Sequence, residues 1–130
     1  MTVLLLAEIG DEQLAHKEAL ERAGFRVIFP PSEVEGRRII STRGYTTAVL
    51  CYSLSSESAE EFAELIRQAC PECPVITVSQ AGVEDRKVDA DIRVALTDGP
   101  AALVRAVGQA ATLVSARERN IEMETKRVGR

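Results

Sequence analysis

Residues 62–79 read FAELIRQACPECPVITVS, and the apolar pattern changes its period within this stretch. The first apolar residues recur at the spacing of one helix face, and they are Phe62, Leu65, Ile66 and Ala69. Pro74 follows, and VITVS at 75–79 is a short apolar run typical of a strand buried on both faces. The stretch therefore predicts a helix that is followed directly by a buried strand.

The rest of the chain repeats this alternation of helix and strand. Apolar runs that predict further strands lie at residues 2–8, 25–29, 47–52 and 92–96. The remaining helices are predicted from Asp11 to Gly24, from Ser32 to about Gly44, and after Asp98-Gly99-Pro100, while a capping box at Ser58 opens the helix of residues 62–69. Five strands alternating with helices predict an α/β fold with a parallel sheet and helices on both faces.

The composition limits the classes of function. A chain of 130 residues, 45% of them hydrophobic, can bury a core without disulfides or metal. The formal charge of −4 disfavours a nucleic-acid-binding surface. The apolar run at 3–7 is too short for a signal peptide or a membrane span, so we expect a cytoplasmic protein with no membrane contact. Its three cysteines are then expected to be reduced.

The C-terminal segment, residues 117–130, carries more basic than acidic residues, unlike the rest of the chain. We predict one domain over residues 1–116 and a charged tail or helix extension over residues 117–130. The tail is interpreted as a solvated or partner-binding segment. The last helix continues toward it with a broken apolar stripe, so self-association as a homodimer stays an open alternative.

Four segments resemble a response-regulator receiver domain, the flavodoxin-like phosphoacceptor module of two-component signalling. They are TVLLLAE at 2–8, AVLCYSLS at 48–55, FAELIRQACPECPVITVS at 62–79 and ALTDGPAALVRAV at 95–107, and the resemblance spans residues 2–111. It implies a five-stranded parallel sheet in the order 2-1-3-4-5. Only the residues 80–90 separate Ser79 from Asp91, which is too few for a full helix with two loops, so helix four is expected to be shortened or missing. The strand-three end also resembles stand-alone pseudo-receivers of bacterial origin.

The resemblance also locates a phosphorylation site. A working receiver needs a carboxylate nucleophile, an acidic pair for Mg²⁺, a hydroxyl and a lysine. In this chain the acidic pair falls on Ala7 and Glu8, the nucleophile on Cys51, the hydroxyl on Ser79, and the lysine on Leu96, which Thr97 follows. Two carboxylates and the lysine are missing. The resemblance therefore implies a degenerate phosphoacceptor site with no catalytic residue, no metal and no cofactor.

The leading interpretation is a non-enzymatic pseudo-receiver that acts by phosphorylation-independent protein–protein interaction. Its partner would be a sensor kinase, another regulator or an output protein, and neither nucleic acid nor a membrane is expected to bind. A small ligand bound at the strand ends is a weaker alternative, because sheets of this kind place ligands there.

The cysteines offer another alternative, a thiol-based redox sensor. Cys70 and Cys73 have the spacing of a redox pair, but they follow a helix, whose dipole raises the pKa of a thiol at that end. Cys51 is expected at the opposite end of the sheet, so four metal ligands cannot be assembled. Beside Glu8, Cys51 is interpreted as a buried neutral thiol. His16 is interpreted as a surface residue of the first helix.

Overall fold

The computed structural model describes residues 1–80 and 86–128, with side chains described as far as Val114. The strands are β1 (Thr2–Leu6), β2 (Arg26–Ile28), β3 (Thr47–Leu50), β4 (Val75–Ser79) and β5 (Ile92–Ala95). The helices are α1 (Asp11–Arg22), α2 (Glu33–Thr42), α3 (Ser56–Ala69) and α4 (Pro100–Val128), and a short 3-10 helix, η1 (Leu96–Asp98), follows β5. All strand pairs are parallel, in the order β2-β1-β3-β4-β5, which confirms the predicted sheet.

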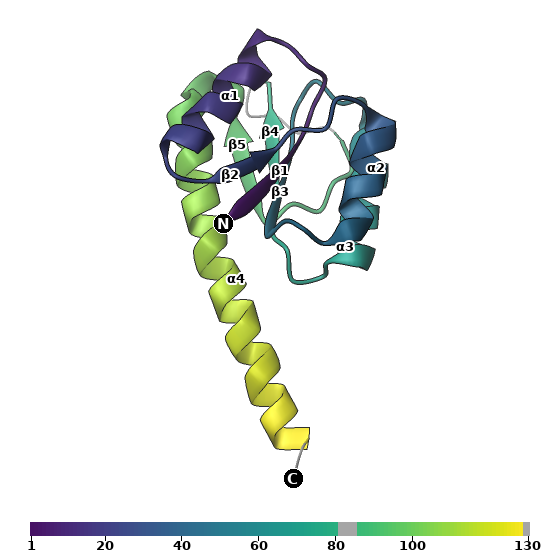
Figure 1. Ribbon diagram of the computed structural model, residues 1–130, viewed down its shortest axis with the longest axis vertical. Coiled ribbons are helices and arrows are strands. Elements are labelled where there is room, and N and C mark those ends of the chain that lie inside the picture. Colours follow the sequence, from purple (N-terminus) through teal and green to yellow (C-terminus); the bar gives the residue numbers. More distant parts are fainter. Residues whose placement is uncertain (81–85, 129–130) are drawn as a thin grey trace.

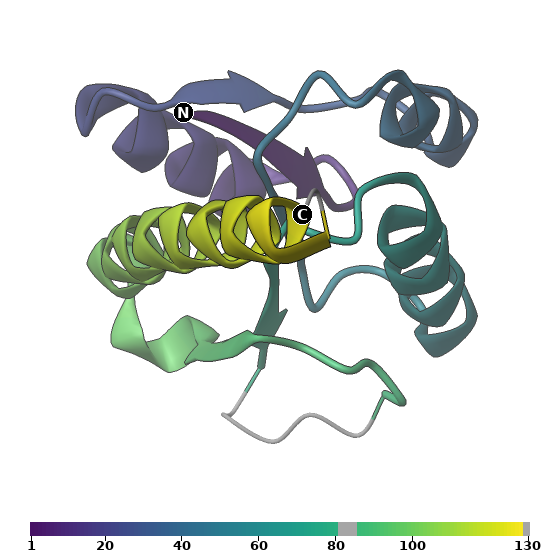
Figure 2. The same cartoon turned by 90° about the horizontal axis from the view of Figure 1, so that it is seen from below.

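Helices cover both faces of the sheet (Figures 1 and 2). The α2/α3 core contains Leu4 and Leu6 of β1 together with Phe62 of α3. The α1/α4 core contains Val3 and Leu5 of β1 together with residues of the other two helices. Successive side chains of β1 thus point to opposite faces. Because both faces are covered, the central strands are mostly apolar, with Thr47, Thr77 and Ser79 as buried polar exceptions, which explains why they read as near-continuous apolar runs.

Helix α2 begins and ends where the sequence predicts, at Ser32 and near Arg43 and Gly44. Ser32 is its N-cap, and the Ser32 Oγ accepts a hydrogen bond from the Glu35 N–H at 3.2 Å. The helix ends at Thr42, and its C-cap, Arg43, adopts the left-handed conformation with φ of 59°. A non-glycine residue thus takes a position that glycine usually occupies.

Helix α3 begins before the expected capping box. The Ser55 Oγ accepts from the Ser58 N–H at 3.1 Å, so Ser55 is the N-cap and Ser58 lies in the first turn. The prediction of a cap at Ser58 is wrong because the earlier serine already satisfies this N–H. After β5, Leu96 belongs to η1 and not to the strand.

Helix α1 turns His16 toward the core. Its buried side chains are Gln13, His16 and Leu20, while Leu14 is 44% exposed. The interpretation of His16 as a surface residue is wrong, since it is only 3% exposed. Packing against both β2 and α4 decides which face turns inward. Burial lowers the pKa of His16, and the nearby Glu12 opposes this shift.

The receiver helix that the sequence predicts to be shortened or missing would lie between β4 and β5, and it is not the helix labelled α4. Residues 86–91 are not helical, and residues 81–85 lie outside the described residues. After β5, α4 begins at Pro100 as predicted, and its backbone is helical to Val128, beyond the sheet (Figure 1). In the described part of the chain, no helix is long and apolar enough to cross a bilayer.

Candidate functional site

The carboxyl ends of four neighbouring strands meet at one edge of the sheet. The last paired residues are Leu6 with Leu50, and Ser79 with Ala95. The residues at and just after these ends form what we call the strand-end site: Ala7, Glu8, Cys51, Ser79, Leu96 and Thr97. The fold thus brings to one edge all the positions that the receiver resemblance singles out.

Three members of the strand-end site pack as apolar groups. Cys51 is fully buried in the α1/α4 core, and Ala7 and Leu96 pack against that same core. These are the positions at which the resemblance implies a nucleophile, a metal-binding carboxylate and a lysine. At this edge they contribute hydrophobic packing.

The thiol of Cys51 is not poised for chemistry. Burial raises the pKa of Cys51 to about 12, and the charge of Arg86 acts weakly in the opposite direction. A thiol with this pKa is neutral at pH 7, whereas nucleophilic attack and metal binding require the thiolate. Cys51 therefore fills space at the end of β3.

The polar members of the site do not converge on one point. Glu8 is exposed, and its backbone N–H donates to the Ser53 Oγ at 3.0 Å. Ser79 is 5% exposed, and its hydroxyl lies 3.5 Å from the Val94 carbonyl oxygen, at the limit of a hydrogen bond. Thr97 is exposed on η1. The carboxylate and the hydroxyls thus face solvent or backbone.

Arg86 is a charged residue of this edge that the sequence analysis did not single out. It is 9% exposed, and its Nη1 donates to the carbonyl oxygens of Cys51 at 2.8 Å and of Leu54 at 3.3 Å. It comes from a polar segment in which no spacing distinguishes it from neighbouring charged residues. Leu96 lies at the end of β5, where the resemblance implies a lysine, whereas the cation beside Cys51 comes from the connection between β4 and β5.

At the rim of the site, the end of β3 is tied to α1, and one small cavity lies beside Ala7. The Tyr52 hydroxyl donates to the Glu12 carboxylate, which raises the pKa of Tyr52 and ties the end of β3 to α1. A cavity lined in part by Ala7, Pro30 and Leu54 has a volume of about 10 Å³, which is room for one water molecule. Small-molecule sites are far larger. Among the described residues, no three His, Cys, Asp or Glu side chains could jointly hold a metal ion.

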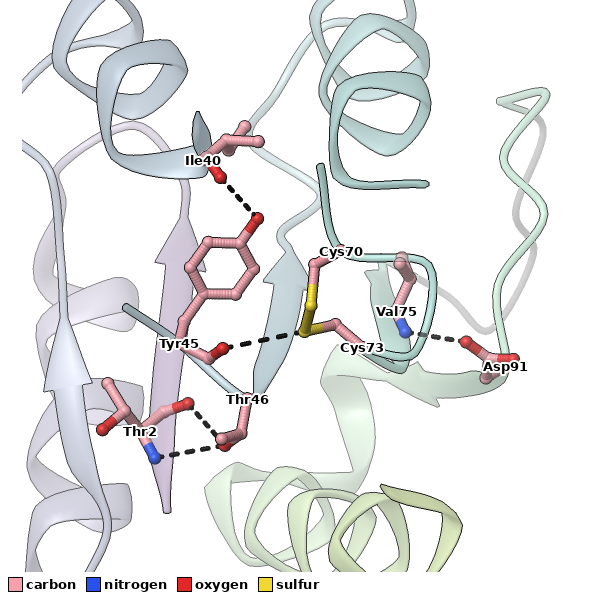
Figure 3. The surroundings of a disulfide bond; sticks show 8 residues. All are labelled: Thr2, Ile40, Tyr45, Thr46, Cys70, Cys73, Val75 and Asp91. Atoms are coloured by element: carbon pink, nitrogen blue, oxygen red, sulfur yellow. Dashed lines mark hydrogen bonds between the residues drawn. A yellow bond between two sulfur atoms is a disulfide. The ribbon is translucent and has the colours of Figure 1, made fainter. Parts of the chain in front are cut away.

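The second candidate site lies at the opposite edge of the sheet (Figure 3). Cys70 and Cys73 form a disulfide, and each is 3% exposed. The expectation of three reduced cysteines is therefore wrong for this pair, while Cys51 is free. The turn after α3 brings the two Cα atoms to 5.4 Å, within the range that a disulfide spans.

The disulfide is embedded in backbone contacts (Figure 3). The Cys73 Sγ lies 3.6 Å from the Tyr45 carbonyl oxygen. A disulfide sulfur carries no hydrogen, so this contact becomes a hydrogen bond only when the thiol is restored. The Tyr45 hydroxyl donates to the Ile40 carbonyl at 2.8 Å, and Asp91 accepts from the Val75 N–H at 2.8 Å. The pair thus sits where α2, α3 and β4 come together.

Solved structures with a similar fold include response-regulator receiver domains. A CheY-like response regulator receiver domain from Methanospirillum hungatei JF-1 has a TM-score of 0.74 and 18% identity, covering 92% of this chain and 97% of that one. A response regulator receiver protein from Sinorhizobium medicae WSM419 has a TM-score of 0.73 and 20% identity, covering 90% and 96%. NtrX from Brucella abortus has a TM-score of 0.78 and 15% identity, covering 99% of this chain and 30% of that one. No family model and no curated protein matches the sequence.

Proposed function

We propose that this chain is a non-enzymatic signalling module of the receiver type, which acts by protein–protein contact and without aspartyl phosphorylation. The observation that carries the proposal is the apolar packing of Ala7, Cys51 and Leu96 at the strand-end site. A receiver that accepts phosphate needs charged groups at these three positions. Here the same positions support the α1/α4 core, so the edge is stabilised in one state by packing.

The remaining polar groups cannot replace the missing ones. Mg²⁺ prefers several oxygen ligands, and Glu8 is the only carboxylate among the strand-end residues. The neutral thiol of Cys51 is a soft and weak ligand for such a hard ion. Phosphoryl transfer depends on metal ions and cations that neutralise developing charge. These deficits together support a module that does not take up phosphate.

The partner is then a protein that recognises the receiver fold in a fixed conformation. A sensor kinase, another regulator and an output protein fit this description, and a second copy of the chain paired along α4 is the remaining alternative. The acidic charge supports a partner other than nucleic acid. Residues 117–128 extend α4 past the predicted domain of residues 1–116, which leaves the end of this helix available for such contacts.

The test is an intact mass of the reduced protein after exposure to acetyl phosphate and Mg²⁺. A receiver domain with its aspartate and lysine in place, treated in parallel, shows that the donor is active. We expect no phosphoryl adduct on the wild type. The Cys51→Asp variant is also expected to stay unmodified, because Ala7 and Leu96 are unchanged. A stable adduct on the wild type would overturn the proposal.

A second candidate function, favoured by the closed Cys70–Cys73 bond, is a thiol-based sensor. A dithiol reductant would donate two electrons and two protons, the S–S bond would break into two thiols, and the reductant would become a disulfide. Cys51 takes no part, since burial keeps its thiol neutral. The signal would be the altered junction of α3 and β4.

A further inference from the structure

Arg86 places a positive charge inside the strand-end site. Its Nη1 serves the carbonyl oxygens of both Cys51 and Leu54, and one terminal guanidinium nitrogen carries the two hydrogens that this requires. Moving a cation out of water is costly unless polar groups replace the lost hydration. Backbone carbonyls that face the guanidinium provide part of that replacement.

The residues that accept these hydrogen bonds form a tight turn, residues 51–54, which we call the β3 turn. Within it, the Leu54 N–H donates to the Cys51 carbonyl at 3.2 Å. The Ser53 Oγ binds the backbone N–H of Glu8 after β1. Arg86 adds an attachment from the connection between β4 and β5. The turn is thus held from within and from both neighbouring parts of the sheet edge.

The oxygen ligands of the β3 turn are of the kind that hard cations prefer. We propose that Arg86 is the resident cation of the strand-end site, a positioning residue whose guanidinium fixes the β3 turn and keeps Cys51 sealed in the core. This inference rests on the proposed function, in which no metal or phosphoryl group loads the site from solvent. The state of the β3 turn is then controlled by whether Arg86 stays in place.

Cys51 is a built-in probe of this arrangement because it is the first residue of the β3 turn and its side chain is fully buried. The chain has three cysteines, so Cys70→Ala/Cys73→Ala leaves Cys51 as its one thiol. In this parent, labelling by N-ethylmaleimide is measured over increasing urea. Labelling through global opening accelerates steeply with urea, whereas labelling through local opening is nearly independent of it.

Arg93 supplies a matched control. Its Nη2 donates to the Val88 carbonyl at 3.2 Å, so it too is a guanidinium on a backbone oxygen of this region, but the side chain is exposed. We expect Arg86→Met to label at least about tenfold faster than the parent without urea, the effect of losing one charge-assisted hydrogen bond. Its labelling is also expected to lose urea dependence, while Arg93→Met follows the parent.

Arg86→Lys separates charge from packing. Lysine keeps the cation and can reach a carbonyl, whereas methionine fills similar space without a donor. Protection of Cys51 is therefore expected in the order Arg, Lys, Met. Equal labelling of Arg86→Met and Arg93→Met, or of the Lys and Met variants, would overturn the inference. If Arg86→Met does not fold by circular dichroism, Arg86→Lys is compared with Arg93→Lys under the same criterion.

The outcome is independent of the phosphodonor experiment. Labelling of Cys51 uses no phosphate and no Mg²⁺, so a change in protection reports on Arg86 alone. A phosphoryl adduct on the wild type with an intact Arg86 effect would overturn the proposed function only. An inert wild type with no Arg86 effect would overturn only the role of Arg86.

Discussion

Reduction of the Cys70–Cys73 disulfide is expected to lower stability by a calculable amount. The bond closes a loop of four residues, since the cysteines are three positions apart. Loop-closure entropy for this length corresponds to about 2 kcal/mol in the free energy of unfolding. An unfolding entropy of about 2.1 cal/mol/K per residue, applied to the 130 residues of the chain, converts this to a fall in Tm of about 7 °C. The thiol of Cys73 can then donate to the Tyr45 carbonyl, which makes this figure an upper value.

The measurement is thermal unfolding by circular dichroism with and without a phosphine reductant. Intact mass, which rises by two hydrogens on reduction, verifies that the bond has opened. Cys70→Ala/Cys73→Ala is the matched control and is expected not to respond to the reductant. Cys51→Ala keeps the pair and is expected to respond as the wild type does.

One result would refute this reasoning. If mass shows the pair fully reduced while Tm stays the same or rises, the bond does not restrict the unfolded chain in the way that loop closure requires. A redox signal based on stability would then be unsupported, and the pair would have only a packing role at the junction of α3 and β4.

Two further predictions concern single side chains. Because burial lowers the pKa of His16, the unfolded chain binds more protons than the folded one below the ordinary imidazole pKa of about 6.5. Wild-type stability is therefore expected to fall more than that of His16→Leu between about pH 7.5 and about pH 5.5, and equal shifts in the urea midpoints would contradict this. Left-handed Arg43 is strained by on the order of 1 kcal/mol, so Arg43→Gly is expected to raise the free energy of unfolding in urea by about 0.5–1 kcal/mol. Arg38→Gly inside α2 is its control and is expected to destabilise; a less stable Arg43→Gly variant would refute the strain.

The sheet was predictable because its signal is carried by the sequence periods themselves. The runs at 2–6 and 75–79 are mostly apolar, as expected of doubly covered strands, and Thr77 and Ser79 are the buried polar residues among them. Boundaries were harder, because Ser55 and Ser58 both have the chemistry of an N-cap and only the backbone path decides between them. His16 was misplaced because the inward face of α1 depends on two packing partners that its own sequence does not specify.

Each candidate site also has parts that the sequence predicts and parts that it does not. Parallel strand ends must share an edge, so the meeting of Cys51 with Ala7 and Leu96 could be anticipated. The contact of Arg86 with the Cys51 carbonyl could not be anticipated, because it depends on where a non-periodic connection crosses the sheet edge. The closing of Cys70 onto Cys73 depended on the turn after α3, whose geometry the spacing alone leaves undetermined.

The length of α4 gives it a mechanical property that the compact part of the fold lacks. Its 29 residues span about 43 Å at a rise of about 1.5 Å per residue. Ala110 is its last fully buried residue in the described part, and residues 111–128 reach about 27 Å farther (Figure 1). A tilt of about 10° where the helix meets the sheet would therefore sweep its far end through about 5 Å. The helix is a lever arm that enlarges small movements of its base.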